Sequence, residues 1–179
     1  PSGFFCPAGA SMAMPASCPP GTYVDGEYSS NDDCVPCPMG SQCAGGGSQP
    51  RLCRPGTKSN ASGLAICLEC DPGSFQEHFN KTECHPCDPG HYCVQGSSTP
   101  LPCPGGSTTN PNLSVMTSSD DCIPCPAGQS CPTGSNAGIA CAPGTNQGET
   151  GKATCDLCVA GKYQGSTGAT SCDECTRGN

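Results

Sequence analysis

The chain has 179 residues, with 20 cysteines, 25 glycines, 20 prolines and a formal net charge of −8 at pH 7. Six Leu, three Ile, five Val and four Phe amount to about a tenth of the chain, which is too little for the core of a globular domain. Cross-links or metals must therefore replace that core, and the excess of acidic over basic residues argues against nucleic acid as a partner.

Residues 1–37 hold the first four cysteines, and the opening segment PSGFFC is informative. It matches PMGSQC, DPGHYC and PAGQSC, each of which directly follows a cysteine in this sequence. We therefore expect a cysteine immediately before Pro1, and we interpret the chain as an excerpt from a longer array.

The cysteine spacing then repeats. From Cys37 to Cys87 successive cysteines are separated by 5, 9, 13, 2, 13 and 2 residues, and the same gaps run from Cys125 to Cys175. Between them the gaps are 5, 9, 18 and 2, which is the same unit with one loop deleted and another lengthened. The period is 88 residues, from Cys37 to Cys125. The sequence predicts four repeat units, alternately short and long, at residues 1–37, 38–87, 88–125 and 126–179.

Each repeat predicts a turn, a polar loop and a closing cysteine. Pro and Gly directly after a cysteine favour the turn, because Pro fixes φ and Gly allows a positive φ. Closing such a loop with a disulfide stabilises the fold by about 3 kcal/mol. We predict small disulfide-rich repeats that form an elongated rod of tandem cysteine-rich modules, with short strands and almost no helix.

Four aromatic residues stand two positions after a turn glycine: Tyr23, Phe75, Tyr92 and Tyr163. We expect each side chain to form a small local core over a neighbouring disulfide. The alternative is a role in stacking against a ligand.

The cysteines at 67–87 and 155–175 form two C-x2-C pairs that are spaced like those of a zinc ribbon. Many other cysteines lie outside any such quartet, in a regular spacing that zinc does not explain. We therefore favour disulfides and expect no metal or other cofactor.

The repeat narrows the disulfide pairing to two schemes. A sequential scheme joins the ends of each long loop and each C-x5-C pair, leaving Cys6 and Cys175 for cysteines before Pro1 and beyond Asn179. An interleaved scheme would join Cys37 to Cys53 and Cys43 to Cys67, and it also satisfies every thiol. The sequential pairs are Cys18–Cys34, Cys37–Cys43, Cys53–Cys67, Cys70–Cys84, Cys87–Cys93, Cys103–Cys122, Cys125–Cys131, Cys141–Cys155 and Cys158–Cys172.

Three sequons, at Asn60, Asn80 and Asn112, fall in loops between cysteines. We expect N-linked glycans there, on a secreted or extracellular chain. The Ser-, Thr- and Pro-rich stretch at residues 97–111 is a candidate for O-linked sugars, with a plain polar loop as the alternative.

Catalysis finds little support in the sequence. His78, His85 and His91 cluster around two cysteines but fit ordinary loop positions. The acidic pairs Asp32-Asp33 and Asp120-Asp121 could hold Ca²⁺ or form a solvated surface. Nucleophile-elbow, phosphate-loop and H-E-x-x-H motifs are missing, so we do not expect an enzyme.

CPPGTYVDGEYSSNDDCVPCPMG, CDPGSFQEHFNKTECHPCDPG and CVAGKYQGSTGATSCDEC share one pattern, namely C-x-x-G-x-aromatic, a polar loop and C-x2-C. This pattern resembles the ephrin-receptor-like cysteine-rich repeat. The loops CRPGTKSNASGLAIC and CAPGTNQGETGKATC depart from it by lacking the aromatic residue. Long arrays of the repeat are similar to surface and matrix proteins of protists, including the shaft protein of algal flagellar hairs, the mastigonemes.

The resemblance implies an extracellular module, at a cell surface or on a flagellar appendage. We expect a structural segment of a glycosylated filament in which copies of the chain contact one another. The alternatives are the stalk of a receptor or adhesin ectodomain and a zinc-binding hub. No long apolar run is present, so we expect no membrane span in this segment.

Overall fold

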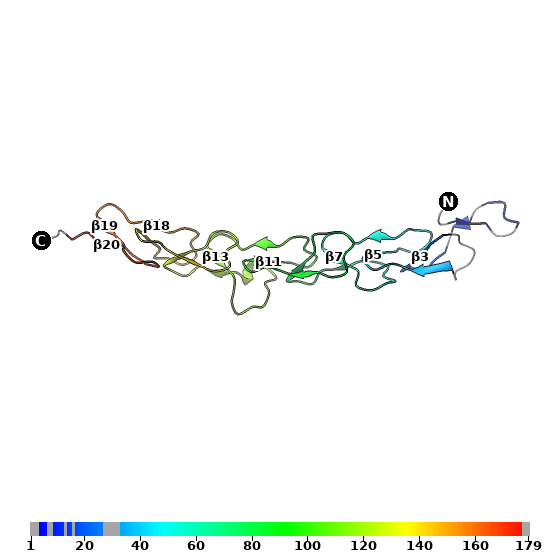
Figure 1. The fold of residues 1–179 in the computed structure, drawn as a ribbon, viewed down its shortest axis with the longest axis horizontal. Helices are drawn as coiled ribbons and strands as arrows, with labels where there is room; N and C mark the ends of the chain where they lie inside the picture. The colour runs from blue at the N-terminus through cyan, green and yellow to red at the C-terminus, as the bar shows by residue number, and fades with distance from the viewer. Residues whose placement is uncertain (1–3, 7–8, 13, 16, 27–32, 177–179) are drawn as a thin grey trace. The chain divides into compact units, whose positions relative to one another are not determined.

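The structure is a computed structural model that describes residues 4–6, 9–12, 14–15, 17–26 and 33–176 (Figure 1). It divides into two compact units. The first comprises Pro1–His85 and Gln95–Thr99, and the second comprises Pro86–Val94 and Pro100–Asn179. The four repeat units and the elongated rod stay predictions.

The strands of the first compact unit are two or three residues long. Figure 1 shows β3, β5 and β7 in chain order along this unit. Its strands are β1 (Phe4–Phe5), β2 (Met14–Pro15), β3 (Thr22–Val24), β4 (Cys34–Pro36), β5 (Ser41–Gln42), β6 (Arg51–Leu52), β7 (Thr57–Lys58), β8 (Leu68–Glu69) and β9 (Ser74–Phe75), and β10 (His85–Pro86) follows at the boundary.

The second compact unit continues the pattern, with β11, β13 and β18 in chain order along it in Figure 1. A single turn of 3₁₀ helix, η2 (Ser119–Asp121), interrupts the strands. The strands are β11 (His91–Tyr92), β12 (Leu101–Pro102), β13 (Ser107–Thr108), β14 (Ile123–Pro124), β15 (Gln129–Ser130), β16 (Ile139–Ala140), β17 (Thr145–Asn146), β18 (Asp156–Leu157), β19 (Lys162–Tyr163) and β20 (Asp173–Glu174).

Within the described residues, the strands pair two by two in chain order, β1 with β2, β3 with β4 and so on, and each pair forms a short two-stranded sheet. The pairing is antiparallel, as between β3 and β4 or β11 and β12. An isolated pair of this length is marginally stable in water, so cross-links have to hold it. The predicted class is confirmed: the chain is built from small disulfide-rich repeat modules with short strands and almost no helix.

The predicted turn is confirmed at the start of each hairpin from β3 onward. Gly21 has a φ of 89°, and the N–H of Thr22 donates to Pro19 O at 3.1 Å, as a type II turn with Gly at its third position requires. The hydroxyl of Thr22 donates to the same carbonyl at 2.7 Å. The same hydroxyl bond recurs at Thr57, Ser74, Ser107 and Thr145.

We call the stretch that starts at the cysteine before each such turn a module. Modules accordingly begin at Cys18, Cys37, Cys53, Cys70, Cys87, Cys103, Cys125, Cys141 and Cys158.

Cysteines form most of the apolar interior. Of the buried hydrophobic residues that the structure describes, only Val24 and Met116 are not cysteines. The buried cysteines are Cys18, Cys37, Cys43, Cys53, Cys70, Cys93, Cys103, Cys125, Cys131 and Cys141.

The expectation that the aromatic side chains form the local core is wrong. Tyr23, Phe75 and Tyr92 are half-buried, and Tyr163 is 54% exposed. The ring of Phe75 lies beside its partner strand, with its centroid 6.2 Å from that of His85. Because side chains alternate along a strand, the next residue points the opposite way, into the module.

That next residue, the sixth after the cysteine that starts a module, supplies the buried position. Gln76 is fully buried and Gln147 is 3% exposed, and Val24 and Ser59 occupy the same position in other modules. The amide of Gln76 donates to Glu83 O at 2.7 Å and accepts from the N–H of His78 at 3.0 Å. The side chain of Gln76 therefore clamps the loop that the Cys70–Cys84 disulfide closes. Gln147 and Gln164 make the equivalent bonds.

Candidate functional site

Nine disulfides cross-link the described cysteines, and they follow the sequential arrangement. Their Cα–Cα separations run from 5.6 to 6.0 Å, within the ordinary range for disulfides. The bonded pairs are Cys18–Cys34, Cys37–Cys43, Cys53–Cys67, Cys70–Cys84, Cys87–Cys93, Cys103–Cys122, Cys125–Cys131, Cys141–Cys155 and Cys158–Cys172.

Cys6 and Cys175 are exposed and free. The partners that the sequence suggests for them, before Pro1 and beyond Asn179, stay a prediction.

The cysteines of the zinc-ribbon-like segment at residues 67–87 are all consumed by disulfides. Cys70 bonds to Cys84 within the segment, whereas Cys67 bonds to Cys53 and Cys87 bonds to Cys93. A bridged sulfur is not a thiolate and cannot serve as a zinc ligand of the usual kind. Among the residues that the structure describes, no group of three or more His, Cys, Asp or Glu is placed to hold a metal ion.

Backbone hydrogen bonds join each module to the next. The bonds between the module at Cys53 and the module at Cys70 run from Gly56 N–H to Gln76 O at 2.7 Å, from Ser59 N–H to Lys81 O at 3.0 Å and from Asn80 N–H to Cys53 O at 3.0 Å. Equivalent bonds join the modules at Cys125 and Cys141 and those at Cys141 and Cys158. We call this arrangement the module ladder. It makes the modules interdependent, although each closes its own disulfide.

The ladder also brings the backbone of every second module into contact. A Cβ atom added to Gly56 would overlap the carbonyl oxygen of Gly96, which lies two modules further on. The same overlap would occur between Gly106 and Gly151. Glycine is therefore required at these turns for two reasons: it adopts a positive φ, and it has no Cβ that would prevent the close approach of the two backbones.

Asn80 occupies the loop position that Gly96 and Gly151 hold in other modules. Its φ is 60°, the only positive φ of a non-glycine residue among those described, and asparagine tolerates this conformation better than most residues. Gly40 contacts Asn80 as Gly56 contacts Gly96, and a Cβ added to Gly40 would overlap the side chain of Asn80.

The three sequon asparagines lie on the surface. Asn60, Asn80 and Asn112 are all exposed, and Asn112 lies in the lengthened loop, where its N–H donates to Asn110 Oδ1 at 3.1 Å. This placement leaves all three side chains accessible to a glycan. Their modification stays a prediction.

The Ser- and Thr-rich stretch at residues 97–111 divides into buried and exposed hydroxyls. Ser97 is 7% exposed and Thr108 is 5% exposed, and the hydroxyl of Thr108 donates to Ser135 O at 3.0 Å. Ser98 and Thr99 are exposed. Any O-linked sugar in this stretch is therefore expected at Ser98 or Thr99.

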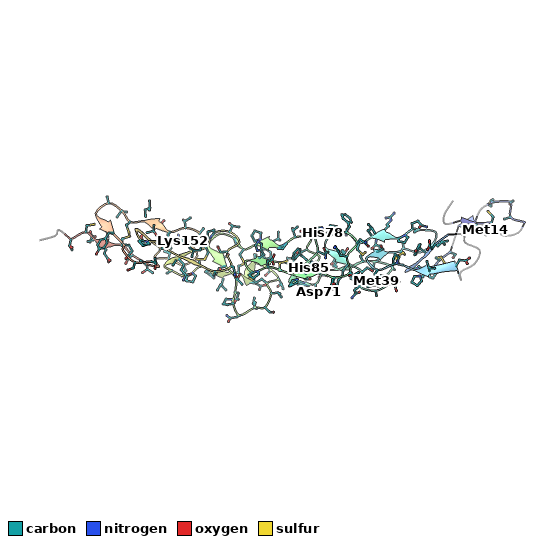
Figure 2. The ribbon with its side chains drawn as sticks, in the orientation of Figure 1. Met14, Met39, Asp71, His78, His85 and Lys152 are labelled. Atoms are coloured by element: carbon teal, nitrogen blue, oxygen red, sulfur yellow. A yellow bond between two sulfur atoms is a disulfide. The ribbon has the colours of Figure 1, made fainter. Side chains whose placement is uncertain are left out.

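The three histidines make separate contacts. His78 Nε2 lies 3.2 Å from Glu77 Oε1, His85 faces the ring of Phe75, and His91 Nδ1 lies 3.3 Å from Pro89 O. Figure 2 shows His78 and His85 on different segments of the first compact unit. None of these contacts forms an acid–base pair next to a nucleophile.

The acidic pair Asp120-Asp121 lies in η2. Oδ2 of Asp121 accepts hydrogen bonds from Thr117 N–H at 2.6 Å, Thr117 Oγ1 at 2.9 Å and Ser118 N–H at 3.0 Å. The bond from the backbone of Thr117 is the largest cause of the lowered pKa of this carboxyl group, followed by the Thr117 hydroxyl and the Ser118 backbone. The carboxylate therefore caps the turn. In the other acidic pair, Asp32 lies outside the described residues.

The sequence analysis did not predict a structural role for the glutamines at the sixth position after a module's first cysteine. It also did not predict the structural role of Asn80, which it named only as a sequon. The signal for the glutamines was present, because Gln76, Gln147 and Gln164 each stand six residues after a cysteine in a C-x13-C loop. The spacing of Asn80 from Cys70 likewise matches that of Gly151 from Cys141.

No protein-family model matches the chain, and no curated protein matches its sequence. In the part of the chain that the structure describes, no helix is long and apolar enough to cross a membrane. The nine disulfides are consistent with a secreted or extracellular protein, because such bonds persist in oxidising compartments.

Proposed function

We propose that the chain is a structural segment of a glycosylated extracellular filament or fibre and that it has no enzymatic activity. The observation that carries this proposal is the module ladder. Most successive modules use equivalent backbone atoms to bind the next module, so the bonding rule depends little on the side chains. Between the modules at Cys87 and Cys103, the hydroxyl of Thr109 takes the place of the backbone carbonyl. A recognition domain needs one distinctive surface, whereas a filament needs a rule that repeats.

The surface chemistry supports the same proposal. The sequons at Asn60, Asn80 and Asn112 are exposed, and N-linked glycans there would cover the polar loops. The disulfides would resist the unfolding and proteolysis that an extracellular fibre meets. The resemblance to ephrin-receptor-like repeats, and through them to mastigoneme shafts, points in the same direction. The partners that we propose are other copies of the chain and covalent glycans.

Immunogold electron microscopy with an antibody against this chain, applied to the organism that makes it, tests the proposal. We expect gold particles at regular intervals along extracellular fibres. Labelling restricted to short stalks beneath a separate head would instead identify a receptor or adhesin ectodomain. Labelling inside the cell would contradict both functions.

A further inference from the structure

Two surface grooves of the same kind differ in charge. The first, which we call the Arg51 groove, has a volume of 330 Å³ and is lined by Gln42, Arg51, Leu52, Arg54, Thr57, Cys67 and Glu69. The second, the Asp156 groove, also has a volume of 330 Å³ and is lined by Asn146, Asp156, Leu157, Val159, Lys162, Thr170, Ser171 and Cys172. The first groove belongs to the first compact unit and the second groove to the second unit.

The two grooves occupy the same place in the repeat. Each begins with the fifth residue after the cysteine that starts one module, which is Gln42 or Asn146. Each continues with the two residues before the next module, with the first and fourth residues after the cysteine that starts that module and with its closing cysteine. Because the backbone framework is shared, the difference between the grooves lies in their side chains.

The Arg51 groove is basic. Arg51 and Arg54 are exposed, and in the part of the chain that the structure describes neither takes part in an ion pair. The single acidic residue of the lining, Glu69, accepts a hydrogen bond from Gln95 at 2.9 Å. Two guanidinium groups are therefore available to a partner in a chain whose net charge is −8.

The Asp156 groove is acidic at its edge. Asp156 is exposed and its carboxylate accepts only a long bond from Gln147, at 3.3 Å. Asp173 and Glu174 follow Cys172 of the lining in sequence and are exposed on β20. Lys162 is the one cation of the lining, and it pairs with Glu174 at 3.0 Å. Asp173 takes part in no ion pair among the described residues. The charge of Asp156 is partly compensated, because the pKa of Lys152 is raised chiefly by its hydrogen bond with Glu149 and also by the charge of Asp156.

Both grooves place apolar surface next to these charges. Leu52 and Leu157 hold equivalent positions and are 56% and 79% exposed, and Val159 is 65% exposed. Protein interfaces combine apolar contact with arginine side chains, so these aliphatic groups beside free arginines suit contact with another molecule.

We propose that the Arg51 groove of one chain binds the Asp156 groove of a second copy of the chain. This inference rests on the proposed function, because it names the surfaces through which copies meet in a fibre. Copies with a net charge of −8 repel one another, so a contact requires a place where opposite charges face each other. The arginine groove supplies such a place, and the leucines supply the apolar contact.

Charge reversal with rescue tests the contact. Sedimentation velocity is run on the 179-residue chain, with Cys6 and Cys175 alkylated so that no disulfide forms between chains. We expect Arg51→Glu with Arg54→Glu to weaken self-association about tenfold or more, and Asp156→Lys with Asp173→Lys to do the same. An equimolar mixture of the two variants should associate again, since each altered groove then meets an opposite charge.

A matched control separates this contact from general repulsion. Lys81→Glu changes the net charge by the same amount as Arg51→Glu alone and lies outside both grooves, so these two single variants are compared. Lys152, labelled in Figure 2, is not used because its charge interacts with that of Asp156. We expect association of the Lys81→Glu control to fall much less than that of the Arg51→Glu variant. Equal loss in both, or no rescue in the mixture, would overturn the inference.

The outcome is independent of the test of the proposed function. A chain that stays monomeric but binds immobilised dextran sulfate through Arg51 and Arg54 would show that the groove takes an anionic polysaccharide, and our inference would be wrong. Gold-labelled fibres together with unaffected charge variants would leave the filament proposal standing and reject this contact. Rescue by the mixture without labelled fibres would retain the contact and reject the filament.

Discussion

The loop closed by Cys70 and Cys84 and the lengthened loop closed by Cys103 and Cys122 stabilise themselves by different means. In the shorter loop one buried side chain, Gln76, bonds to the backbone at both of its amide atoms. The lengthened loop has Thr109 at the equivalent position, and its hydroxyl accepts a hydrogen bond from Gly90 N–H at 2.5 Å. It adds η2, the Asp121 cap and the buried side chain of Met116.

The ladder between modules is nevertheless kept. Gly106 N–H donates to Cys131 O at 2.7 Å and Gly134 N–H donates to Cys103 O at 2.9 Å, as their counterparts do around the shorter loops. The backbone contacts with the following module are thus kept, whereas the interior of the loop and the bond from Gly90 on its other side vary. A loop can gain five residues, from a 13-residue to an 18-residue gap, when its own turn and cap replace the glutamine clamp.

The largest loss of stability is expected from substitutions in the module ladder, on which both kinds of loop depend. Gly56→Ala and Gly106→Ala each place a Cβ against a backbone carbonyl two modules away and force a positive φ on alanine. We expect a loss of about 3 kcal/mol in the free energy of unfolding for each, measured by guanidinium unfolding with tyrosine fluorescence.

Gly144→Ala is the matched control for these variants. Gly144 has nearly the same φ, 84° against 83° for Gly56, but open space where the Cβ would lie. It should lose only about 1 kcal/mol, from backbone strain. Where a variant fails to be secreted, its yield relative to that of the Gly144→Ala chain serves as the readout. Equal losses at all three glycines would show that the contact between modules contributes nothing.

The second effect concerns the glutamine clamp. Gln76→Ala leaves the carbonyl of Glu83 and the N–H of His78 without their partner inside the loop, and we expect a loss of about 2 kcal/mol. Limited proteolysis should cleave the variant faster between Cys70 and Cys84, and no faster between Cys103 and Cys122.

Gln95→Ala provides the control, since Gln95 is exposed and bonds only to the carboxylate of Glu69. Its stability should change by less than about 0.5 kcal/mol. A Gln76→Ala chain as resistant to protease as the Gln95→Ala chain would remove the distinction between the two kinds of loop.

The turns could be predicted from the sequence, and the disulfide pairing could be narrowed to two schemes, because each depends on residue types that few others replace. Gly and Pro set the turn, and the spacing of cysteines marks the loops. The buried sixth position escaped prediction because the residues that occupy it across the modules, Val24, Ser59, Gln76 and Cys43, share neither size nor polarity. The aromatic residues were misplaced because in strands of two residues a shift of one position exchanges the buried face for the exposed one.

A third, smaller effect is expected at Asn80, where a glycosylation signal coincides with a glycine-like backbone. Asn80→Gly removes the sequon and suits a φ of 60°, so stability should be unchanged or slightly higher. Asn80→Gln also removes the sequon but disfavours this φ, and we expect a loss of about 1 kcal/mol. Both comparisons use enzymatically deglycosylated chains.

Thr82→Ala is the control that removes the sequon and leaves Asn80 in place. Mass spectrometry of the glycosylated chain should find glycan on the peptide that contains Asn80, and none after any of the three substitutions. Bare peptides at Asn60, Asn80 and Asn112 in the native chain would reject the glycosylation proposal.

The smallest effect is expected at Asp121 and should remain within the lengthened loop. Hydrogen bonds from Thr117 and Ser118 lower the pKa of this carboxyl group in the folded chain, so its contribution to stability is present above the pKa of the unfolded chain. It is lost as the pH falls through the lower, folded value. Amide hydrogen exchange at Thr117 and Ser118, corrected for the intrinsic pH dependence, should therefore accelerate in acid. Asp121→Asn should show faster exchange already at neutral pH and little further change on acidification, while the loop from Cys70 to Cys84 behaves alike in both chains. Because the glutamine clamp carries no titrating group, acid-sensitive protection that appeared equally in both loops would mean that the Asp121 cap is not what replaces it.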